Sequence, residues 1–154
     1  MAAKEYEQGA VDEGIEETNE QDAVDVLEFE LDTDGFCVEI GYIAEIVNCG
    51  ELTNLPSTPP HIEGVLNLRE EAVKVINLKQ LLEVGEEYAD EKLIVFKRKD
   101  GADSRLGWLV DGVRGVHSFT PSEVEAGGNA PGVEGVIRRG DDFVIWLDPA
   151  RMRI

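Results

Sequence analysis

The sequence predicts a mainly β protein built from two similar halves, each a small β-barrel. Three observations support this fold class: short apolar runs alternate with turn-forming residues, helical signals are brief, and segments recur about 71 positions apart. Regularly spaced short strands favour barrels or sandwiches over a parallel sheet with crossover helices. Since each half is small, we expect the halves to pack together and leave a groove at their junction.

The N-terminal segment differs in composition from the rest of the chain. Residues 1–23 carry eight acidic side chains, one lysine and few apolar residues, so they cannot bury enough surface to fix their backbone. We expect a flexible, solvated tail, with partner binding as the alternative. The ordered domain is expected at residues 24–154, with subdomains at about 24–84 and 88–154.

Strand signals begin directly after this tail. Alternation of apolar and acidic residues at 27–31 predicts a strand, and turn formers at 32–35 predict a hairpin with the apolar run at 36–40. Further apolar runs predict strands at residues 64–68, 72–76, 93–97, 106–110, 133–137 and 143–147. Brief helical signals stand at residues 41–47, 78–82, 120–123, which has a capping-box pattern, and 149–152.

Three segments recur in the same order along the chain. An offset of 71 relates the first two pairs, and the third recurs 70 positions later. The pairs are residues 63–66 with 134–137, residues 73–77 with 144–148, and Ile43-x-x-Ile46 with Val113-x-x-Val116. Because chance rarely produces ordered matches at nearly one offset, they indicate two similar supersecondary units.

The charge balance disfavours several classes of partner. With 33 acidic and 14 basic side chains and a net charge of −19, the chain would be repelled by nucleic-acid phosphates and by anionic lipid. No apolar run approaches the roughly 20 residues of a membrane span, and the N-terminus lacks the apolar stretch of a signal peptide. We therefore expect a cytoplasmic protein. Acidity spread along the whole chain suggests a salt-loving host.

Motifs for chemistry are missing from the sequence. No phosphate-binding, zinc-protease or nucleophile-elbow pattern occurs, so we expect no enzyme activity, cofactor or metal site. His61 and His117 are expected at the surface or lightly packed, and the two cysteines are given no redox or metal role. Trp108 and Trp146 alternate with aliphatic residues, which indicates core packing rather than ligand stacking.

One arginine stands out in this acidic chain. Arg69 directly precedes two glutamates, Glu70 and Glu71. Its guanidinium can pair locally with those carboxylates or present a fork of donors to a partner, and the sequence leaves both possibilities open.

Four motifs carry a family resemblance. They are Ile43-Ala44-Glu45-Ile46, Leu-Pro-x-x-Pro at 55–59, Ile-Glu-Gly-Val-Leu-Asn-Leu-Arg at 62–69, and Gly-Trp-Leu-Val-Asp-Gly-Val-Arg-Gly-Val at 107–116. In order and spacing they resemble the CheW-like domain family of chemotaxis coupling proteins over about residues 24–154. The resemblance implies two intertwined SH3-like β-barrels, each five-stranded, with short helices.

The resemblance also implies a function. Members of this family are non-catalytic adaptors that link the regulatory domain of the histidine kinase CheA to the cytoplasmic tips of chemoreceptors, in arrays at the inner face of the membrane. The positions that match kinase contacts are Ile43, Glu45, Gly64 and Arg69. The positions that match a receptor-binding groove are Ile46, Val47, Val113 and Val116. Ordinary core packing is the alternative role for each groove residue.

Three residues depart from the family pattern. Glu70 stands where the family has Gly after the arginine, Lys74 stands in place of Pro, and Asn77 stands in place of Asp. Because Gly permits backbone conformations that disfavour Glu, we expect a rebuilt turn after Arg69. The alternative function is a diverged CheW-like binding module for another regulator, or for a chemosensory pathway that does not control motility.

Overall fold

The computed structural model describes residues 22–54, 56, 58–83, 92–98, 105–126 and 132–152. The acidic tail predicted at residues 1–23 lies almost entirely outside this part of the chain, as do the subdomain boundaries predicted at residues 84, 88 and 154. The described residues are mainly β with few helices, as the sequence predicts.

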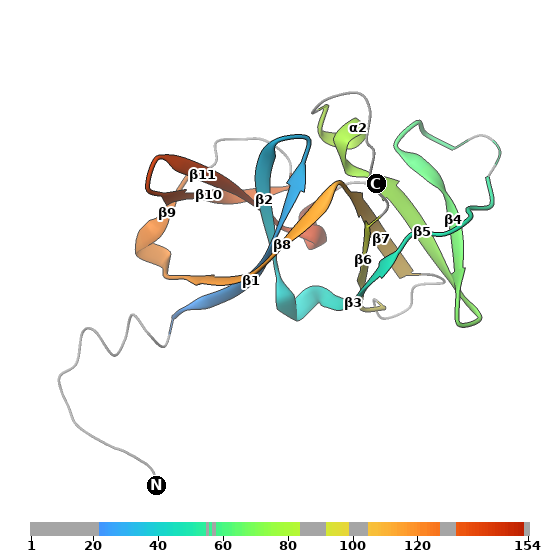
Figure 1. The fold of residues 1–154 in the computed structure, drawn as a ribbon, viewed down its shortest axis with the longest axis horizontal. Coiled ribbons are helices and arrows are strands. Elements are labelled where there is room, and N and C mark those ends of the chain that lie inside the picture. Colours follow the sequence, from blue (N-terminus) through green and yellow to red (C-terminus); the bar gives the residue numbers. More distant parts are fainter. Residues whose placement is uncertain are drawn as a thin grey trace, which may run out of the picture.

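Two β-sheets form the fold, and Figure 1 shows them side by side. Sheet A has the order β8-β1-β2-β11-β10-β9, with strands β1 (Val24–Leu31), β2 (Asp34–Glu39), β8 (Gly112–Phe119), β9 (Val124–Glu125), β10 (Val133–Arg139) and β11 (Asp142–Leu147). Sheet B has the order β3-β6-β7-β5-β4, with strands β3 (Ile43–Asn48), β4 (Ile62–Leu68), β5 (Glu71–Asn77), β6 (Lys92–Phe96) and β7 (Arg105–Val110). The short helical elements are α2 (Leu78–Leu82), η1 (Ile40–Tyr42), η2 (Pro121–Glu123) and η3 (Pro149–Arg151). Sheet B has the five strands expected, and sheet A has six because the two-residue β9 pairs with β10.

The sheets do not follow the two halves of the sequence. All strands of sheet B come from one stretch, β3 to β7, whereas sheet A joins β1 and β2 to β8, β9, β10 and β11. The chain passes from sheet A to sheet B at η1 and returns at Asp111. The two units are therefore intertwined, and the division predicted near residue 84 falls between two strands of sheet B.

The sequence repeat is also a structural repeat. Strands β4 and β10 lie 71 residues apart, and each has a β-bulge at a buried glycine, Gly64 or Gly135. After these hairpins, β5 pairs in parallel with β7, and β11 pairs in parallel with β2. The edge strands β3 and β8 pair with β6 and β1 in the same antiparallel sense. Both sheets thus share one strand order, in which β3 corresponds to β8.

Most local predictions are confirmed, but one is wrong, and two strands, β8 and the two-residue β9, are missed. The β1–β2 hairpin, helix α2, the capping box before η2 and the helical turn η3 are present. The helix predicted at residues 41–47 is wrong: only η1 is helical there, and β3 follows because its β-branched residues Ile43, Ile46 and Val47 favour a strand that pairs with β6. Strand β8 is missed because its apolar residues stand three positions apart and a bulge interrupts its pairing with β1.

Three apolar cores stabilise the two sheets. The inter-sheet core consists of Leu27, Phe29, Leu31, Phe36, Val38 and Leu147 from sheet A, with Ile76, Leu78, Ile94, Phe96, Trp108 and Val110 from sheet B and its helix. The sheet B core consists of Leu66, Val73, Val75, Leu93, Val95 and Leu109. The sheet A core consists of Val26, Cys37, Phe119, Ile137 and Val144. Trp108 is 1% exposed. Its ring centroid lies 4.6 Å from that of Phe96 in the same sheet and 6.1 Å from that of Phe29 in the other sheet, so Trp108 packs across the junction.

A buried ion pair fixes the place where the chain returns to sheet A. Lys79 Nζ of α2 lies 2.8 Å from Asp111 Oδ2, and their side chains are only 4% and 14% exposed. The same carboxylate accepts a hydrogen bond from the backbone N–H of Asp32, and the N–H of Asp111 donates to the carbonyl oxygen of Glu30 at 3.0 Å. These contacts join the helix of sheet B to the β1–β2 hairpin. With the inter-sheet core, they hold the two sheets in one arrangement.

Candidate functional site

An exposed ion pair joins opposite edges of sheet B. Arg69 and Glu70 form a two-residue turn between β4 and β5, with φ angles of 50° and 70°. From this turn, Arg69 Nη1 and Nη2 donate to the two carboxylate oxygens of Glu45 on β3 at 2.6 and 2.7 Å. The bidentate geometry orients the guanidinium plane, and 70% of the arginine side chain is still exposed. Because β3 and β4 are the two edges of the sheet, the pair shows that sheet B curls round toward itself.

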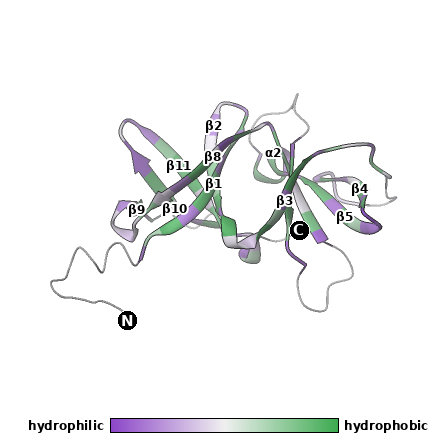
Figure 2. Ribbon diagram, turned by 60° about the horizontal axis from the view of Figure 1, so that its bottom comes forward, coloured by the Kyte–Doolittle hydropathy of each residue, from purple (hydrophilic) through white to green (hydrophobic). Residues whose placement is uncertain are grey.

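Both members of this pair are charged at neutral pH. The hydrogen bond from Arg69 lowers the pKa of Glu45 below its usual value, and the same bond raises the pKa of Arg69. Of the two possibilities that the sequence leaves open for Arg69, local pairing does not occur: its guanidinium pairs with Glu45 of β3 instead of with its neighbours Glu70 and Glu71. Glu70, which stands where the family has Gly, itself adopts the left-handed conformation. Figure 2 shows that the tip of this hairpin is hydrophilic.

The other two residues matched to kinase contacts are less accessible. Ile43 begins β3 and is half-buried against the inter-sheet core. Gly64 is buried at the bulge of β4, where an added Cβ would lie 2.7 Å from the carbonyl oxygen of Thr53. No side chain fits at that distance without moving the backbone. Gly64 therefore shapes the β4–β5 hairpin, and only Glu45 and Arg69 present charged groups at the surface.

Three of the four residues matched to a receptor groove are exposed. The exposed fraction is 41% for Ile46, 36% for Val113 and 60% for Val116, so core packing does not explain them. Their cross-strand neighbours, Ile94, Phe29 and Leu27, all belong to the inter-sheet core. Ile46 lies opposite Ile94, Val113 opposite Phe29, and Val116 opposite Leu27. Since cross-strand neighbours share a face of the sheet, these residues extend the inter-sheet core to the edges β3 and β8.

Val47 differs from these three groove residues. It lies opposite Leu93 of β6 and packs, half-buried, against the sheet B core. Successive residues of a strand point to opposite faces, so Val47 faces away from the side that Ile46 occupies. Ile46, Val113 and Val116 thus each lie on the face of their own sheet that carries the inter-sheet core, whereas Val47 lies inside the curl of sheet B.

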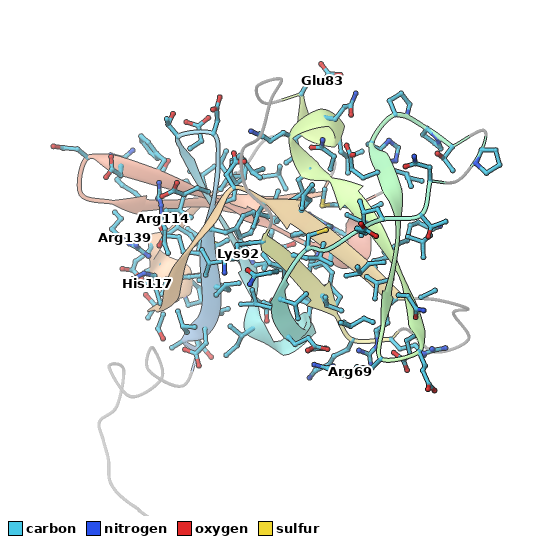
Figure 3. All side chains as sticks on the ribbon, turned by 45° about the vertical axis from the view of Figure 1, so that its right-hand side comes forward. Arg69, Glu83, Lys92, Arg114, His117 and Arg139 are labelled. Atoms are coloured by element: carbon cyan, nitrogen blue, oxygen red, sulfur yellow. The ribbon has the colours of Figure 1, made fainter. Side chains whose placement is uncertain are left out.

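A second charge cluster lies within sheet A. Glu28 of β1 is 3% exposed and accepts hydrogen bonds from Arg139 Nη1 at 2.6 Å and Arg114 Nη1 at 3.0 Å. His117 Nε2 lies 3.4 Å from the same carboxylate, and Arg114 also donates to Glu30. Burial alone would raise the pKa of Glu28, but hydrogen bonds from Arg139 and Arg114 outweigh it, and the pKa is lowered. Figure 3 shows Arg114, His117 and Arg139 together on sheet A, and Arg69 apart from them on sheet B.

Within the described ranges, no group of three or more His, Cys, Asp or Glu side chains could hold a metal ion. In the same part of the chain, no helix is long and apolar enough to cross a bilayer.

Comparisons with known proteins agree with one another. The model of the CheW-like domain matches residues 25–153. The chain is 30% identical over 132 residues to the chemotaxis protein CheW of Treponema pallidum, with 80% of this chain and 78% of the relative covered. It is 27% identical over 129 residues to the chemotaxis protein CheW of Thermotoga maritima, with 80% and 83% covered. The crystal structure of the scaffolding protein TtCheW from Thermoanaerobacter tengcongensis has the same fold, with a TM-score of 0.72 at 24% identity over 81% of this chain and 88% of that one.

Proposed function

Since this chain belongs to the CheW-like domain family, we propose that it is a non-catalytic adaptor that couples the cytoplasmic tips of chemoreceptors to the histidine kinase CheA. The match of the family model to residues 25–153, which include both sheets, carries this proposal. An adaptor needs two docking surfaces on one rigid body and no reaction at either. Its proposed place of action is the cytoplasm, at receptor arrays on the inner face of the membrane, without contact to lipid or nucleic acid.

The proposed kinase surface centres on the Arg69–Glu45 pair. Its bidentate bond fixes the guanidinium at the tip of the β4–β5 hairpin, and its exposure leaves donors available for the regulatory domain of CheA. Ile43 and Gly64 support this surface from within, through the start of β3 and the bulge of β4.

The proposed receptor surface consists of the exposed groove residues. An amphipathic helical hairpin buries its apolar side against an apolar strip, and Ile46, Val113 and Val116 continue the inter-sheet core to the surface at β3 and β8. Val47 contributes indirectly, by packing β3 onto the sheet B core.

The test is co-sedimentation with receptor-containing membranes and purified CheA. We expect Arg69→Glu to abolish the ternary complex, because it sets a carboxylate against Glu45 and against the kinase, while the circular dichroism spectrum stays intact. We expect Val116→Asp to abolish receptor binding while kinase binding persists, since this side chain is 60% exposed. Ala126→Asp, beyond β9 at the opposite edge of sheet A, is the matched control and should leave both interactions unchanged.

Two outcomes of this test would contradict the proposal. If both charged variants sediment like the wild-type chain, the assigned surfaces are wrong. If the wild-type chain binds neither purified CheA nor a receptor fragment, the alternative applies, in which the same fold serves another regulator or a chemosensory pathway that does not control motility.

A further inference from the structure

The edge strands β3 and β8 have a bulge at equivalent places. In the motifs Ile43-x-x-Ile46 and Val113-x-x-Val116, the apolar residues stand three positions apart. A regular strand would turn them to opposite faces, because successive side chains alternate. The pairing with the neighbouring strand passes over one residue inside each motif, Ala44 of β3 and Arg114 of β8. Each motif thus contains one extra residue, as a β-bulge does.

The bulge turns both apolar residues of a motif to the same face of its strand. Val113 and Val116 lie opposite core residues of β1 that stand two positions apart, Phe29 and Leu27. Cross-strand neighbours share a face, so both valines lie on the side of the inter-sheet core. The same holds for the two isoleucines of β3, which lie opposite core residues of β6. The apolar strip at these edges therefore depends on the bulges.

The bulge of β8 requires a glycine. Gly115 has a φ of 128°, a conformation that residues with a Cβ rarely adopt. Among the described residues, no atom lies within 4 Å of a Cβ added there, so the requirement comes from the backbone and not from crowding. A side chain at this position would strain the bulge without a direct clash.

An ion-pair network fastens the same bulge from its polar face. Arg114, the extra residue, donates from Nη1 to Glu28 and from Nε to Glu30, each at 3.0 Å. Glu28 is 3% exposed and also accepts a hydrogen bond from Arg139 of β10, which lies near Arg114 on sheet A (Figure 3). Gly35 of β2 leaves room for the guanidinium, since an added Cβ there would lie 2.6 Å from Arg114 Nη1. The extra residue is thus held on the side of Glu28, away from the apolar strip.

We infer that the bulge of β8 positions Val113 and Val116 for the receptor, with Gly115 and Arg114 as its positioning residues. The inference rests on the proposed function, in which the receptor tip docks on these valines. Neither positioning residue needs to touch the receptor. Gly115 permits the backbone conformation of the bulge, and Arg114 anchors the extra residue to the buried carboxylate of Glu28.

The experiment measures the affinity of the full chain for a purified cytoplasmic receptor fragment and, separately, for purified CheA. We expect Gly115→Ala to weaken receptor binding about tenfold and to leave kinase binding unchanged, because a strand that loses its bulge turns one valine to the other face. The matched control is Gly140→Ala in the β10–β11 turn, where φ is 61° and an added Cβ likewise meets no described atom within 4 Å. It also places a Cβ at a positive φ, but away from β8, so its receptor affinity should equal that of the wild-type chain.

Further variants test the geometry without relying on strain at Gly115. Deletion of Arg114 places Val113 and Val116 two positions apart and leaves their pairing with β1 as it is, so a regular strand turns both to one face. Glycine has no special role in this shortened strand. We therefore expect deletion of Arg114 combined with Gly115→Ala to bind the receptor fragment more tightly than Gly115→Ala alone. Arg114→Ala keeps the extra residue without its anchor, and should weaken receptor binding more than Arg138→Ala, which alters a 58% exposed arginine of β10.

The outcomes separate this inference from the proposed function. If Val116→Asp abolishes receptor binding while Gly115→Ala and Arg114→Ala bind like their controls, the receptor surface is correct and the bulge does not position it. Equal losses of receptor and kinase binding in Gly115→Ala would place its effect on the whole fold, and this inference would be wrong. It is also wrong if deletion of Arg114 brings no recovery in the Gly115→Ala background. If the wild-type chain does not bind the receptor fragment, the proposed function is wrong, and the role given to the bulge is wrong with it.

Discussion

Glu45 and Gly115 occupy equivalent positions on the edge strands of the two sheets, 70 residues apart in the sequence. Glu45 of β3 lies opposite Val95, whereas Gly115 of β8 lies opposite Glu28. The carboxylate therefore lies on the edge strand in sheet B but on the strand next to the edge in sheet A. In each sheet this carboxylate pairs with an arginine, but the side chain of Glu45 is 21% exposed whereas that of Glu28 is only 4% exposed.

The buried pair should contribute far more to stability than the exposed one. We expect Glu28→Gln to lower the free energy of unfolding by about 2–4 kcal/mol, because it leaves Arg139 and Arg114 without their anionic partner. Urea unfolding measures the change. The control is Glu125→Gln, which breaks the surface pair with Arg138 and should cost no more than about 1 kcal/mol. Equal losses in the two variants would contradict the importance of burial.

The same carboxylate makes stability depend on pH. The pKa of Glu28 in the folded protein lies below its usual value of 4.5, because the hydrogen bonds from Arg139 and Arg114 outweigh the effect of burial. A group with a lowered folded pKa binds its proton more readily in the unfolded chain, so its stabilisation is present above pH 4.5 and is lost as the pH falls further. The difference in unfolding free energy between wild type and Glu28→Gln should therefore be constant from neutral pH to about 4.5 and shrink below it. A difference that grows in acid would refute this assignment.

The sequence predicts the repeat and most strands because both depend on local pattern. Residues 63–66 and 134–137 have nearly the same sequence, and they lie in equivalent bulged strands. The environment of Glu28 is not local. Alternation at 27–31 places this residue on the polar face of β1, but sheet A curls so that this face lies inside, against Arg114 and Arg139, which are 86 and 111 residues away.

The site was predictable only in part, for a related reason. Arg69 is recognisable as an unusual cation, but its partner lies 24 residues away on the opposite edge of sheet B, and only the curl of the sheet brings the two together. Likewise, Val113 and Val47 have the same side chain, and their different exposure follows from which face of an edge strand each occupies. No pattern within β8 reveals that face, because the bulge opposite Glu28 breaks its alternation.

Asn77 departs from the family pattern for a reason that the structure supplies. Its Nδ2 donates to Glu63 Oε2 at 2.9 Å, while its Oδ1 caps α2 by accepting from the N–H of Gln80 at 3.2 Å. Asp could keep the cap but would set a second carboxylate against Glu63. We expect Asn77→Asp to destabilise the protein by about 1–3 kcal/mol, and the double variant with Glu63→Gln to recover most of that loss, as measured by urea unfolding. Additive losses in the double variant would show that the two side chains are not coupled.

The turn between β4 and β5 stores strain at Glu70. Its φ of 70° lies in the left-handed region, which Gly adopts without the steric cost that a Cβ imposes. We expect Glu70→Gly to stabilise the protein by about 0.5–1 kcal/mol and to raise the thermal midpoint. The contrasting variant is Ala72→Gly in β5, where an extended backbone gives Gly no such advantage and stability should fall. If both glycines destabilise the protein equally, strain at Glu70 is not significant.

The excess of negative charge should make stability rise with salt. At a net charge of −19, repulsion among surface carboxylates opposes the compact state, and it is screened as ionic strength increases. We expect the thermal midpoint to rise between about 0.1 and about 2 M KCl, which is the behaviour required of a protein from a salt-loving host. The buried contacts of Glu28 are screened much less, so the loss of stability in Glu28→Gln should be nearly the same at both salt concentrations. A midpoint that stays constant or falls would mean that the acidity of this chain does not adapt it to salt.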